Sequence, residues 1–226
     1  MTIKVYPELI QGSDEWLEAR RGVLTASEMK LILTPTLKAA ANEKERCHLY
    51  EIAAQRISGY VEPTYITNDM LRGQEDEIYA RAEYAKHYAE VSEVGFITND
   101  QWGFTLGFSP DGLVGDDGFI EIKSRRQKFQ VQTVIENEVS SEYVLQIQTG
   151  LLVSGRTWCD FVTYCGGLHM MTLRVHPDPF MQEAIVEAAT KFEVRVSEKI
   201  NAYRARLGSG MRLVPTERHI QQEITP

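Results

Sequence analysis

Three residues near the middle of the chain have types and spacings suited to hydrolysis: Asp111, Glu121 and Lys123. Glu121 and Lys123 are two apart in a short β-type run, so their side chains point to the same face of a strand. Asp111 belongs to the preceding Pro-Asp-Gly turn. If residues 116–118 form a three-residue hairpin loop, residue 113 pairs with 121 and residue 111 with 123. The spacing therefore predicts that all three side chains share one face of a hairpin.

Two carboxylates in this arrangement can bind one divalent cation. The Cβ atoms of Asp111 and Glu121 would lie about 7 to 8 Å apart, and side chains of this length can converge on one ion. Oxygen ligands suit Mg²⁺, for which Mn²⁺ can substitute. Such an ion lowers the pKa of a bound water and offsets charge on a phosphate, while Lys123 could position that water or assist proton transfer. The residue types favour metal-dependent hydrolysis of a phosphodiester.

The charge distribution limits how the chain could bind a nucleic acid. Its 32 acidic and 24 basic residues give a formal net charge of −8, which argues against coating DNA by bulk attraction. Local basic residues lie in two places, at the pair Arg20-Arg21 and in the run Lys123, Arg125, Arg126 and Lys128. A solvated surface is the simpler interpretation of a basic run alone. A nucleic-acid role must therefore depend on local charge.

The segment around residue 25 could hold a phosphate. Thr25-Ala26-Ser27-Glu28 has the pattern of a capping box that opens a helix to about Leu33, with Ser27 in the exposed first turn. A helix N-terminus offers unpaired amides, and Arg20 adds a guanidinium that can bind an anion through two hydrogen bonds. On these residues alone, a capped helix with surface arginines is the simpler interpretation.

Hydrophobic periodicity predicts the elements that must position these residues. Helices are predicted at 25–33, 43–58, 69–90, 141–153 and 179–206. Short strands are predicted at 94–98, 103–109, 119–123, 158–165 and 168–175. The helix at 69–90 carries an apolar stripe, expected to be its buried face: Leu71, Ile78, Ala82, Ala85 and Ala89. The order predicts an α/β fold with a central mixed β-sheet flanked by helices. We expect a single domain over residues 1–207 and a polar tail over 208–226.

The sequence also indicates where the protein works. Its apolar stretches are far shorter than the ~20 residues of a membrane helix, and its N-terminus lacks the apolar core of a signal peptide. We therefore expect a cytoplasmic protein without a membrane partner. Three cysteines cannot all pair, and their spacing matches no disulfide framework or metal site: Cys47, Cys159 and Cys165.

Taken together, the motifs resemble a known nuclease signature. Pro110-Asp111 followed by Glu121-Ile122-Lys123 is similar to the PD-(D/E)xK pattern of a large nuclease superfamily. The surrounding segments occur in the order seen in the phage lambda exonuclease-like family of viral recombinases: Arg20–Glu28, Gly73–Glu77, Ser109–Gly112 and Gln146–Gln148. The similarity spans about residues 16–152. It implies a core of the restriction-endonuclease type.

The resemblance implies a set of metal ligands. The first metal would be held by the carboxylates of Asp111 and Glu121 and by the carbonyl of Ile122. Glu77 would serve a second metal or its waters. Glu75 lies in the same predicted helical turn and stays an alternative to Glu77, although the family spacing favours Glu77.

The resemblance also implies the remaining roles and an activity. Lys123 would orient the nucleophilic water with support from Gln148, and Arg20 and Ser27 would hold a terminal 5′ phosphate. The implied activity is that of a Mg²⁺-dependent 5′-to-3′ exodeoxyribonuclease. It would degrade one strand of linear duplex DNA from a 5′-phosphorylated end and leave a 3′ single-stranded overhang for strand annealing. A homotrimeric ring and a single-strand annealing protein as partner belong to the same expectation.

Three other functions remain open. A structure-selective or restriction-like endonuclease of the same superfamily would linearise closed circular DNA, which an enzyme that needs a 5′ end leaves intact. A non-catalytic DNA-end-binding module would bind without cleaving, but the complete set of Asp111, Glu121 and Lys123 argues against it. A carboxylate-pair glycosidase would survive EDTA, but the adjacent basic run favours a phosphate substrate.

Overall fold

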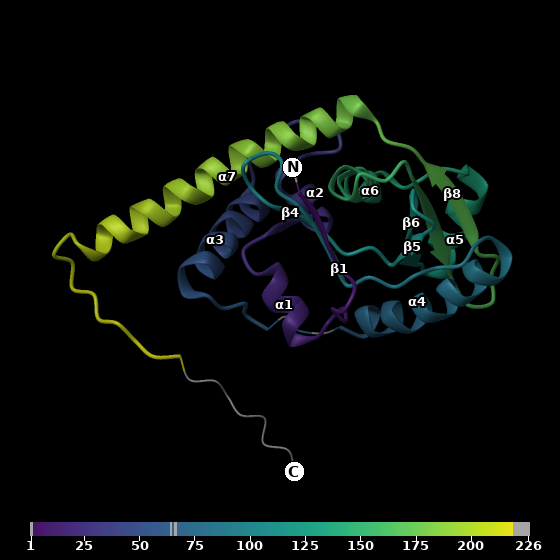
Figure 1. Cartoon of the computed structure of the whole chain (residues 1–226), viewed down its shortest axis with the longest axis horizontal. Coiled ribbons are helices and arrows are strands. Elements are labelled where there is room, and N and C mark those ends of the chain that lie inside the picture. The colour runs from purple at the N-terminus through teal and green to yellow at the C-terminus, as the bar shows by residue number, and fades with distance from the viewer. Residues whose placement is uncertain (1, 64, 66, 219–226) are drawn as a thin grey trace, which may run out of the picture.

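Two four-stranded β-sheets form the centre of the protein (Figure 1). The computed structural model describes residues 2–63, 65 and 67–218. The first sheet has the order β1-β3-β4-β2 and the second the order β5-β6-β7-β8. Each sheet contains a parallel pair beside antiparallel ones, namely β2 with β4 and β6 with β7. The predicted α/β class with mixed strand pairing is confirmed, although the strands form two hydrogen-bonded groups.

The strands are short, and the chain passes directly from the first sheet into the second through residues 109–111. The first sheet contains β1 (Ile3–Tyr6), β2 (Leu24–Thr25), β3 (Phe96–Asn99) and β4 (Leu106–Phe108). The second contains β5 (Gly112–Val114), β6 (Gly118–Ser124), β7 (Trp158–Tyr164) and β8 (Met171–Val175). The passage between the sheets carries Asp111.

Helices cover the second sheet on both faces, α4 on one and α6 on the other (Figure 1). The helices before β3 are α1 (Asp14–Arg20), the 3₁₀ helix η1 (Ala26–Glu28), α2 (Met29–Ile32), α3 (Glu43–Ser58) and α4 (Asn68–His87). Those after β6 are α5 (Gln127–Glu136), α6 (Ser141–Ser154) and α7 (Pro179–Leu207). The predicted helices at 43–58, 141–153 and 179–206 are confirmed to within one residue.

Strand β6 separates two apolar clusters because its side chains alternate between the sheet faces. Ile120 and Ile122 pack with Ala80 and Tyr84 of α4. Phe119, on the other face, is fully buried in the larger cluster that includes α6. Glu121 and Lys123 therefore leave β6 on the α6 side, as the two-residue spacing predicts.

Gly150 sets the distance between α6 and the sheets. A Cβ atom at this position would lie 2.8 Å from the ring of Phe108 and 3.0 Å from that of Phe119. These two rings pack edge to face with centroids 4.8 Å apart, an arrangement that aromatic pairs favour. Glycine therefore lets α6 approach β4 and β6 more closely than a residue with a side chain could.

The buried face of α4 differs from the prediction. Leu71 and Ile78 are 52% and 64% exposed, whereas Ala80 and Tyr84 are fully buried. The Tyr84 hydroxyl donates a 2.6 Å hydrogen bond to Asp160 of β7, which removes the cost of burying that polar group. The predicted apolar stripe is therefore wrong. The hydrogen-bonded Tyr84 lies in the core, whereas Leu71 and Ile78 lie on the surface.

The hairpin register also differs from the prediction. Gly112 pairs with Ile120 and Val114 with Gly118, so the loop comprises residues 115–117. Gly115, with φ of +53°, takes the left-handed position that was expected at Gly118. The shift is two residues, so it keeps every side chain on its predicted face. Continued by one residue, the register places Asp111 opposite Glu121 rather than opposite Lys123.

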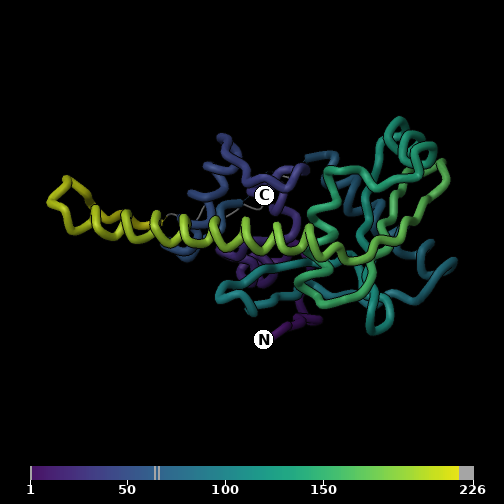
Figure 2. Tube along the Cα trace, turned by 90° about the horizontal axis from the view of Figure 1, so that it is seen from above, coloured from purple at the N-terminus to yellow at the C-terminus, as the bar shows by residue number. Residues whose placement is uncertain are grey.

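The last helix, α7, runs along one side of the protein and projects beyond it (Figures 1 and 2). Its middle part packs on α3, where Arg56 and Arg195 pair with Glu193 and Glu45. Residues 201–207 are exposed. The boundary predicted at 207 coincides with the end of α7, but the division into domain and tail stays a prediction. No described helix is both long and apolar enough to cross a membrane.

Candidate active site

Strand β6 brings Glu121 and Lys123 together in its second half, beyond the residues that pair with β5. Their side chains form an ion pair with Nζ and Oε1 2.6 Å apart. Glu121 is only 1% exposed, and the lysine side chain is 22% exposed. The pair is therefore shielded from water on the carboxylate side, while the ammonium reaches a small pocket.

Asp111 joins this pair through the backbone of β6. Its Oδ2 accepts a 2.5 Å hydrogen bond from the amide of Ile122. The N–H and C=O groups of one strand residue point to the same edge, so the carbonyl of Ile122 faces the Asp111 side as well. The two predicted carboxylates therefore line one pocket, and the carbonyl of Ile122 lies on the Asp111 side of β6.

Glu77 approaches the same point from α4. It lines a cleft of about 810 Å³ together with Asp111, Arg81 and Arg20, and Arg81 donates a hydrogen bond to its Oε1. Glu75 is exposed and does not line this cleft. Helix geometry, which directs residues two apart to different sides, thus selects Glu77 from the two predicted alternatives.

The structure places Gln146, and not Gln148, beside the carboxylates. Gln146 donates a 2.6 Å hydrogen bond to Glu121 Oε1. Gln148 is buried and bonds elsewhere: its amide nitrogen donates to the carbonyl of His176, and its oxygen accepts from the amide of Asp178. The prediction that Gln148 supports Lys123 is therefore wrong. Residues two apart on a helix face different sides. Gln148 instead binds the backbone of residues 176 and 178, just before α7 begins.

Burial determines the electrostatics of the carboxylates. It raises the pKa of Glu121 from its ordinary value of 4.5 to about 7, with Lys123 opposing the shift and Asp111 reinforcing it. Burial and the neighbouring Asp111 likewise raise the pKa of Glu77 to about 7. Burial also raises the pKa of Asp111. These carboxylates lack sufficient positive charge around them, so a cation that binds there gains more than it would at a solvated site.

Lys123 responds in the opposite direction. Burial alone would lower its pKa, but the charges of Glu121 and Asp111 outweigh burial and raise it above the ordinary value of 10.5. The side chain is therefore an ammonium ion near neutral pH. It is suited to donating hydrogen bonds to water or phosphate, and in this state it has no free electron pair with which to accept a proton.

The donor set fits a hard divalent cation such as Mg²⁺ or Mn²⁺. Glu121 Oε2 is buried and has no hydrogen-bond partner among the described residues, which is costly unless a ligand satisfies it. Among the residues that the structure describes, no group of three or more His, Cys, Asp or Glu side chains is arranged to hold a metal. The site instead combines two carboxylates with a backbone carbonyl, an oxygen-only set.

Arg20 and the start of η1 form the neighbouring wall. The guanidinium of Arg20 lies 4.2 Å from the centroid of Trp16 and donates to the hydroxyls of Ser109 and Thr25 at 3.2 and 3.3 Å. The Thr25 hydroxyl lies 3.2 Å from that of Ser27. The predicted capping box is present, because the Thr25 amide donates to Glu28. Arg20 is thus held rigidly with its remaining donors available for an anion.

These two sets of residues share one pocket of about 190 Å³. Its walls contain, among others, Arg20, Thr25, Ser27, Asp111, Glu121, Lys123 and Gln146. An anion held by Arg20 would therefore lie in the same space that the carboxylates face.

Tyr143 is a site residue that the sequence reasoning missed. Lys123 Nζ lies 5.2 Å from the centroid of its ring, and its hydroxyl accepts a 2.8 Å hydrogen bond from Arg125. The ring therefore supports the ammonium by a cation–π contact. Tyr143 precedes Gln146 by three residues and so shares its face of α6, a spacing that could have indicated it.

The basic run after β6 is only partly free. Arg125, with a side chain 10% exposed, pairs with Glu142, and Arg126 pairs with Asp69 at 2.8 Å. Together with the ion pair of Lys123 and Glu121, these contacts give three of the four basic residues an acidic partner.

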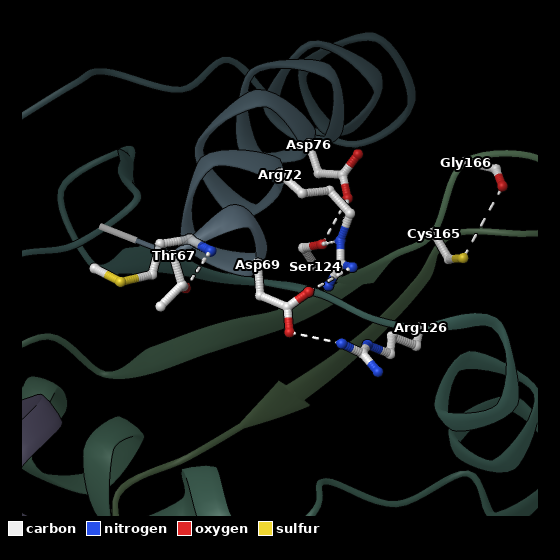
Figure 3. A network of polar contacts seen from close by, with 9 residues as sticks. Thr67, Asp69, Arg72, Asp76, Ser124, Arg126, Cys165 and Gly166 are labelled. Atoms are coloured by element: carbon white, nitrogen blue, oxygen red, sulfur yellow. Dashed lines mark hydrogen bonds and ion pairs between the residues drawn. The ribbon is translucent and has the colours of Figure 1, made fainter. Parts of the chain in front are cut away.

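A polar network ties α4 to the end of β6 (Figure 3). Ser124 donates a 2.5 Å hydrogen bond to Asp76 and accepts one from Arg72 at 3.3 Å. Arg72 and Arg126 both bond to Asp69. Asp76 and Ser124 are the direct neighbours of Glu77 and Lys123 in the sequence. The network therefore fixes the helix that carries Glu77 against the strand that carries Lys123.

Comparisons with known proteins identify relatives of this chain. Residues 15–157 match the family model of the YqaJ-like viral recombinase domain. The crystal structure of an alkaline exonuclease from Laribacter hongkongensis is 30% identical, with a TM-score of 0.77, over 87% of this chain and 98% of that one. The same enzyme in complex with dAMP matches over the same shares of both chains at 32% identity, with a TM-score of 0.78.

More distant comparisons add only the fold. A phage-related exonuclease from Haemophilus somnus is 12% identical, covers 80% of this chain and 96% of that one, and has a TM-score of 0.57. No curated protein sequence gives a significant match. The family model covers more than half of the chain, and its match confirms the resemblance to lambda exonuclease-like proteins. The chain therefore belongs to the YqaJ-like viral recombinase family.

Proposed function

We propose that the protein is a cytoplasmic Mg²⁺-dependent exodeoxyribonuclease that degrades one strand of linear duplex DNA from a 5′-phosphorylated end, in the 5′-to-3′ direction. One observation carries this proposal. The carboxylates Asp111 and Glu121 and the ammonium of Lys123 share a pocket of about 190 Å³ with Arg20 and Ser27. The exonuclease activity of the Laribacter protein supports the same reaction class.

In this proposal Asp111, Glu121 and the carbonyl of Ile122 hold Mg²⁺. The bound ion would lower the pKa of a water and offset charge on the phosphate. The Lys123 ammonium donates hydrogen bonds that orient the attacking water and a phosphate oxygen. Gln146 and the ring of Tyr143 hold Glu121 and Lys123 in place, and a role in proton acceptance for Lys123 is disfavoured by its raised pKa.

The residues that hold the terminal phosphate would determine which bond is cut. Arg20 and Ser27 would hold the terminal 5′ phosphate, and the carboxylates would then act on the next phosphodiester, one nucleotide along the strand. Cleavage would release mononucleotides and leave a 3′ single-stranded overhang for recombination by strand annealing. Glu77, which faces Asp111 across the cleft, would serve a second metal or its waters.

The assembly and partners belong to the same proposal. A homotrimeric ring around the DNA would retain the substrate of an acidic protein. The exposed end of α7, with Tyr203 48% and Leu207 57% exposed, offers apolar surface for such an assembly. A single-strand annealing protein would receive the exposed strand. Sedimentation equilibrium tests the ring, and a monomer mass at micromolar concentration would contradict it.

The activity can be tested with one set of substrates. Linear duplexes with a 5′ phosphate or a 5′ hydroxyl, labelled at either end, are incubated in Mg²⁺ and in EDTA. We expect mononucleotides from the phosphorylated 5′ end in Mg²⁺ only. Closed circular DNA should stay intact. Linearised circles would indicate an endonuclease, and binding without cleavage in Mg²⁺ would indicate an end-binding module.

A further inference from the structure

Arg81 lies between two carboxylates that belong to different parts of the chain. On one side it donates a hydrogen bond to Oε1 of Glu77, one helical turn earlier in α4. On the other side its NH1 lies 2.7 Å from Oε2 of Glu93, in the segment that follows α4. All three residues line the cleft of about 810 Å³ that reaches Asp111. The guanidinium is therefore shared between the candidate site and the cleft.

The two carboxylates differ in exposure. The side chain of Glu77 is 27% exposed and that of Glu93 is 75% exposed, whereas that of Arg81 is 18% exposed. A solvated carboxylate gains little from an ion pair, but a shielded one gains more. The contact of Arg81 with Glu77 is thus the stronger of the two. Glu93 provides a second carboxylate with which the guanidinium can pair.

The cations in the site divide it into two halves. Lys123 pairs with Oε1 of Glu121, and the other oxygen, Oε2, has no partner among the described residues. Arg81 pairs with Glu77, and its charge also acts on Asp111. The Glu121 half therefore offers a free oxygen for a cation, whereas the Glu77 half already contains a positive charge.

We propose that Arg81 is an internal counter-ion that occupies the place of a second divalent cation at Glu77, and that it must move towards Glu93 before that cation binds. The inference depends on the proposed function, because it presumes a first cation at Asp111 and Glu121. It makes the two cations unequal: the first binds to a free oxygen, and the second has to displace a guanidinium.

Arg81 is built for such a movement. Its Nε is buried without a hydrogen-bond partner among the described residues, so a rotation about the end of the side chain breaks only the bond to Glu77. The NH1 contact with Glu93 can persist during that rotation. Arg81 acts here through Glu77 and does not need to touch the reacting atoms, which makes it a positioning residue.

Titration of the metal-free protein with Mn²⁺ tests this inference without any assay of activity. Calorimetry and the electron paramagnetic resonance signal of bound Mn²⁺ give the number and affinity of sites. We expect one site in the wild type that Asp111→Asn removes, and a second at least about tenfold weaker. Arg81→Met should tighten the second site about 10- to 100-fold. Adding Glu77→Gln to Arg81→Met should abolish it.

Two further variants separate displacement from a general charge effect. Lys86→Met removes a positive charge from an exposed position of α4, where its partner is Glu83, and should leave both sites unchanged. Glu93→Gln removes the second place of Arg81 at an exposed position that folding tolerates, and should weaken the second site. Even if Arg81→Met folds poorly, the response of Glu93→Gln decides the question.

The outcomes that contradict the inference are distinct from failure of the proposed function. Two equal sites in the wild type would contradict it, as would an unchanged second site in both Arg81→Met and Glu93→Gln. In each of these cases the first site remains intact. Absence of any Mn²⁺ binding that depends on Asp111 would instead contradict the proposed function, and the inference with it.

Discussion

Buried carboxylates occur in two regions of the protein, and they are treated differently. In the scaffold, Asp160 accepts hydrogen bonds from Tyr84 and from two nitrogens of Arg174. Glu193 accepts two from Arg56 at 2.6 and 2.8 Å. At the candidate site, Glu121 is equally buried, yet one of its oxygens has no partner among the described residues.

The difference separates structural charge from functional charge. A buried carboxylate that is saturated by arginine and tyrosine donors is stable as it stands. A buried carboxylate with a free oxygen and a pKa near 7 stores unfavourable energy that a ligand can relieve. Buried carboxylates with a raised pKa and a free oxygen therefore indicate the site. Buried carboxylates with a full set of hydrogen bonds belong to the scaffold that supports it.

The largest expected effect lies at the unsatisfied carboxylates. Asp111→Ala and Glu121→Gln should each reduce turnover by about 10³-fold or more, and Lys123→Ala by about 10²- to 10³-fold. At pH 8 the melting temperature of Glu121→Gln should equal or slightly exceed that of the wild type, because the amide removes a buried charge. Near-normal digestion by Glu121→Gln would remove it from the site.

The saturated carboxylates should show the reverse behaviour. Asp160→Asn should lower the free energy of unfolding by about 2 to 3 kcal/mol, since it breaks the hydrogen bonds of Tyr84 and Arg174. The folded variant should keep its turnover. Urea unfolding and digestion of the same preparation measure both quantities. A loss of turnover without a loss of stability would erase the distinction between the two regions.

A variant of Arg20 tests whether the proposed phosphate-binding residues, Arg20 and Ser27, belong to the functional region. Arg20→Ala should slow digestion of 5′-phosphorylated ends by about 100-fold, because it removes charge-assisted hydrogen bonds, and should affect 5′-hydroxyl ends much less. Arg21→Ala is the matched control, since Arg21 bonds to Glu18 and to the carbonyl of Gly59 instead. Equal losses on both kinds of end would make Arg20 a structural residue.

The most gradual expected effect is the dependence of metal affinity on pH. Protonated carboxylates do not bind cations well, so Mn²⁺ affinity should rise about tenfold per pH unit up to about pH 7 and then level off. Because these pKa values are raised on folding, the metal-free protein should lose stability as pH rises from 4.5 to about 7. Glu121→Gln should flatten the profile, whereas Asp160→Asn should leave its midpoint in place. A wild-type profile flat across this range would contradict the raised pKa values.

Periodicity in the sequence predicted most of the frame. The helices α3, α6 and α7 were predicted to within one residue, because they have clear caps and stops such as Gly59 and the Asp178-Pro179 start. The cluster of Asp111, Glu121 and Lys123 was predicted from strand alternation. That argument tolerated a register error of two residues, since an even shift changes no face.

Other features depended on contacts that no local pattern encodes. The buried face of α4 depends on Tyr84 finding Asp160, a partner 76 residues away. The choice of Gln146 over Gln148 depends on the rotation of α6 about its axis. Helix α5 was missed because most of its apolar residues are exposed, including Val134 at 46% and Ile135 at 76%. Strand β1 and helix α1 were missed as well, since both are short and contain no buried residue.

The close contact at Gly150 has a consequence for how this family can diverge. Gly150 lies one turn after Gln146 on α6 and lets this helix approach the rings of Phe108 and Phe119. The same helix presents Gln146 to Glu121, so a shift of α6 would move that contact. A methyl group at 150 would need a smaller ring at Phe108 or Phe119 to compensate. These three positions should therefore covary among relatives. Substitutions in this tightly packed aromatic contact would then change the geometry of catalysis, although none of them alters a residue proposed to hold the metal.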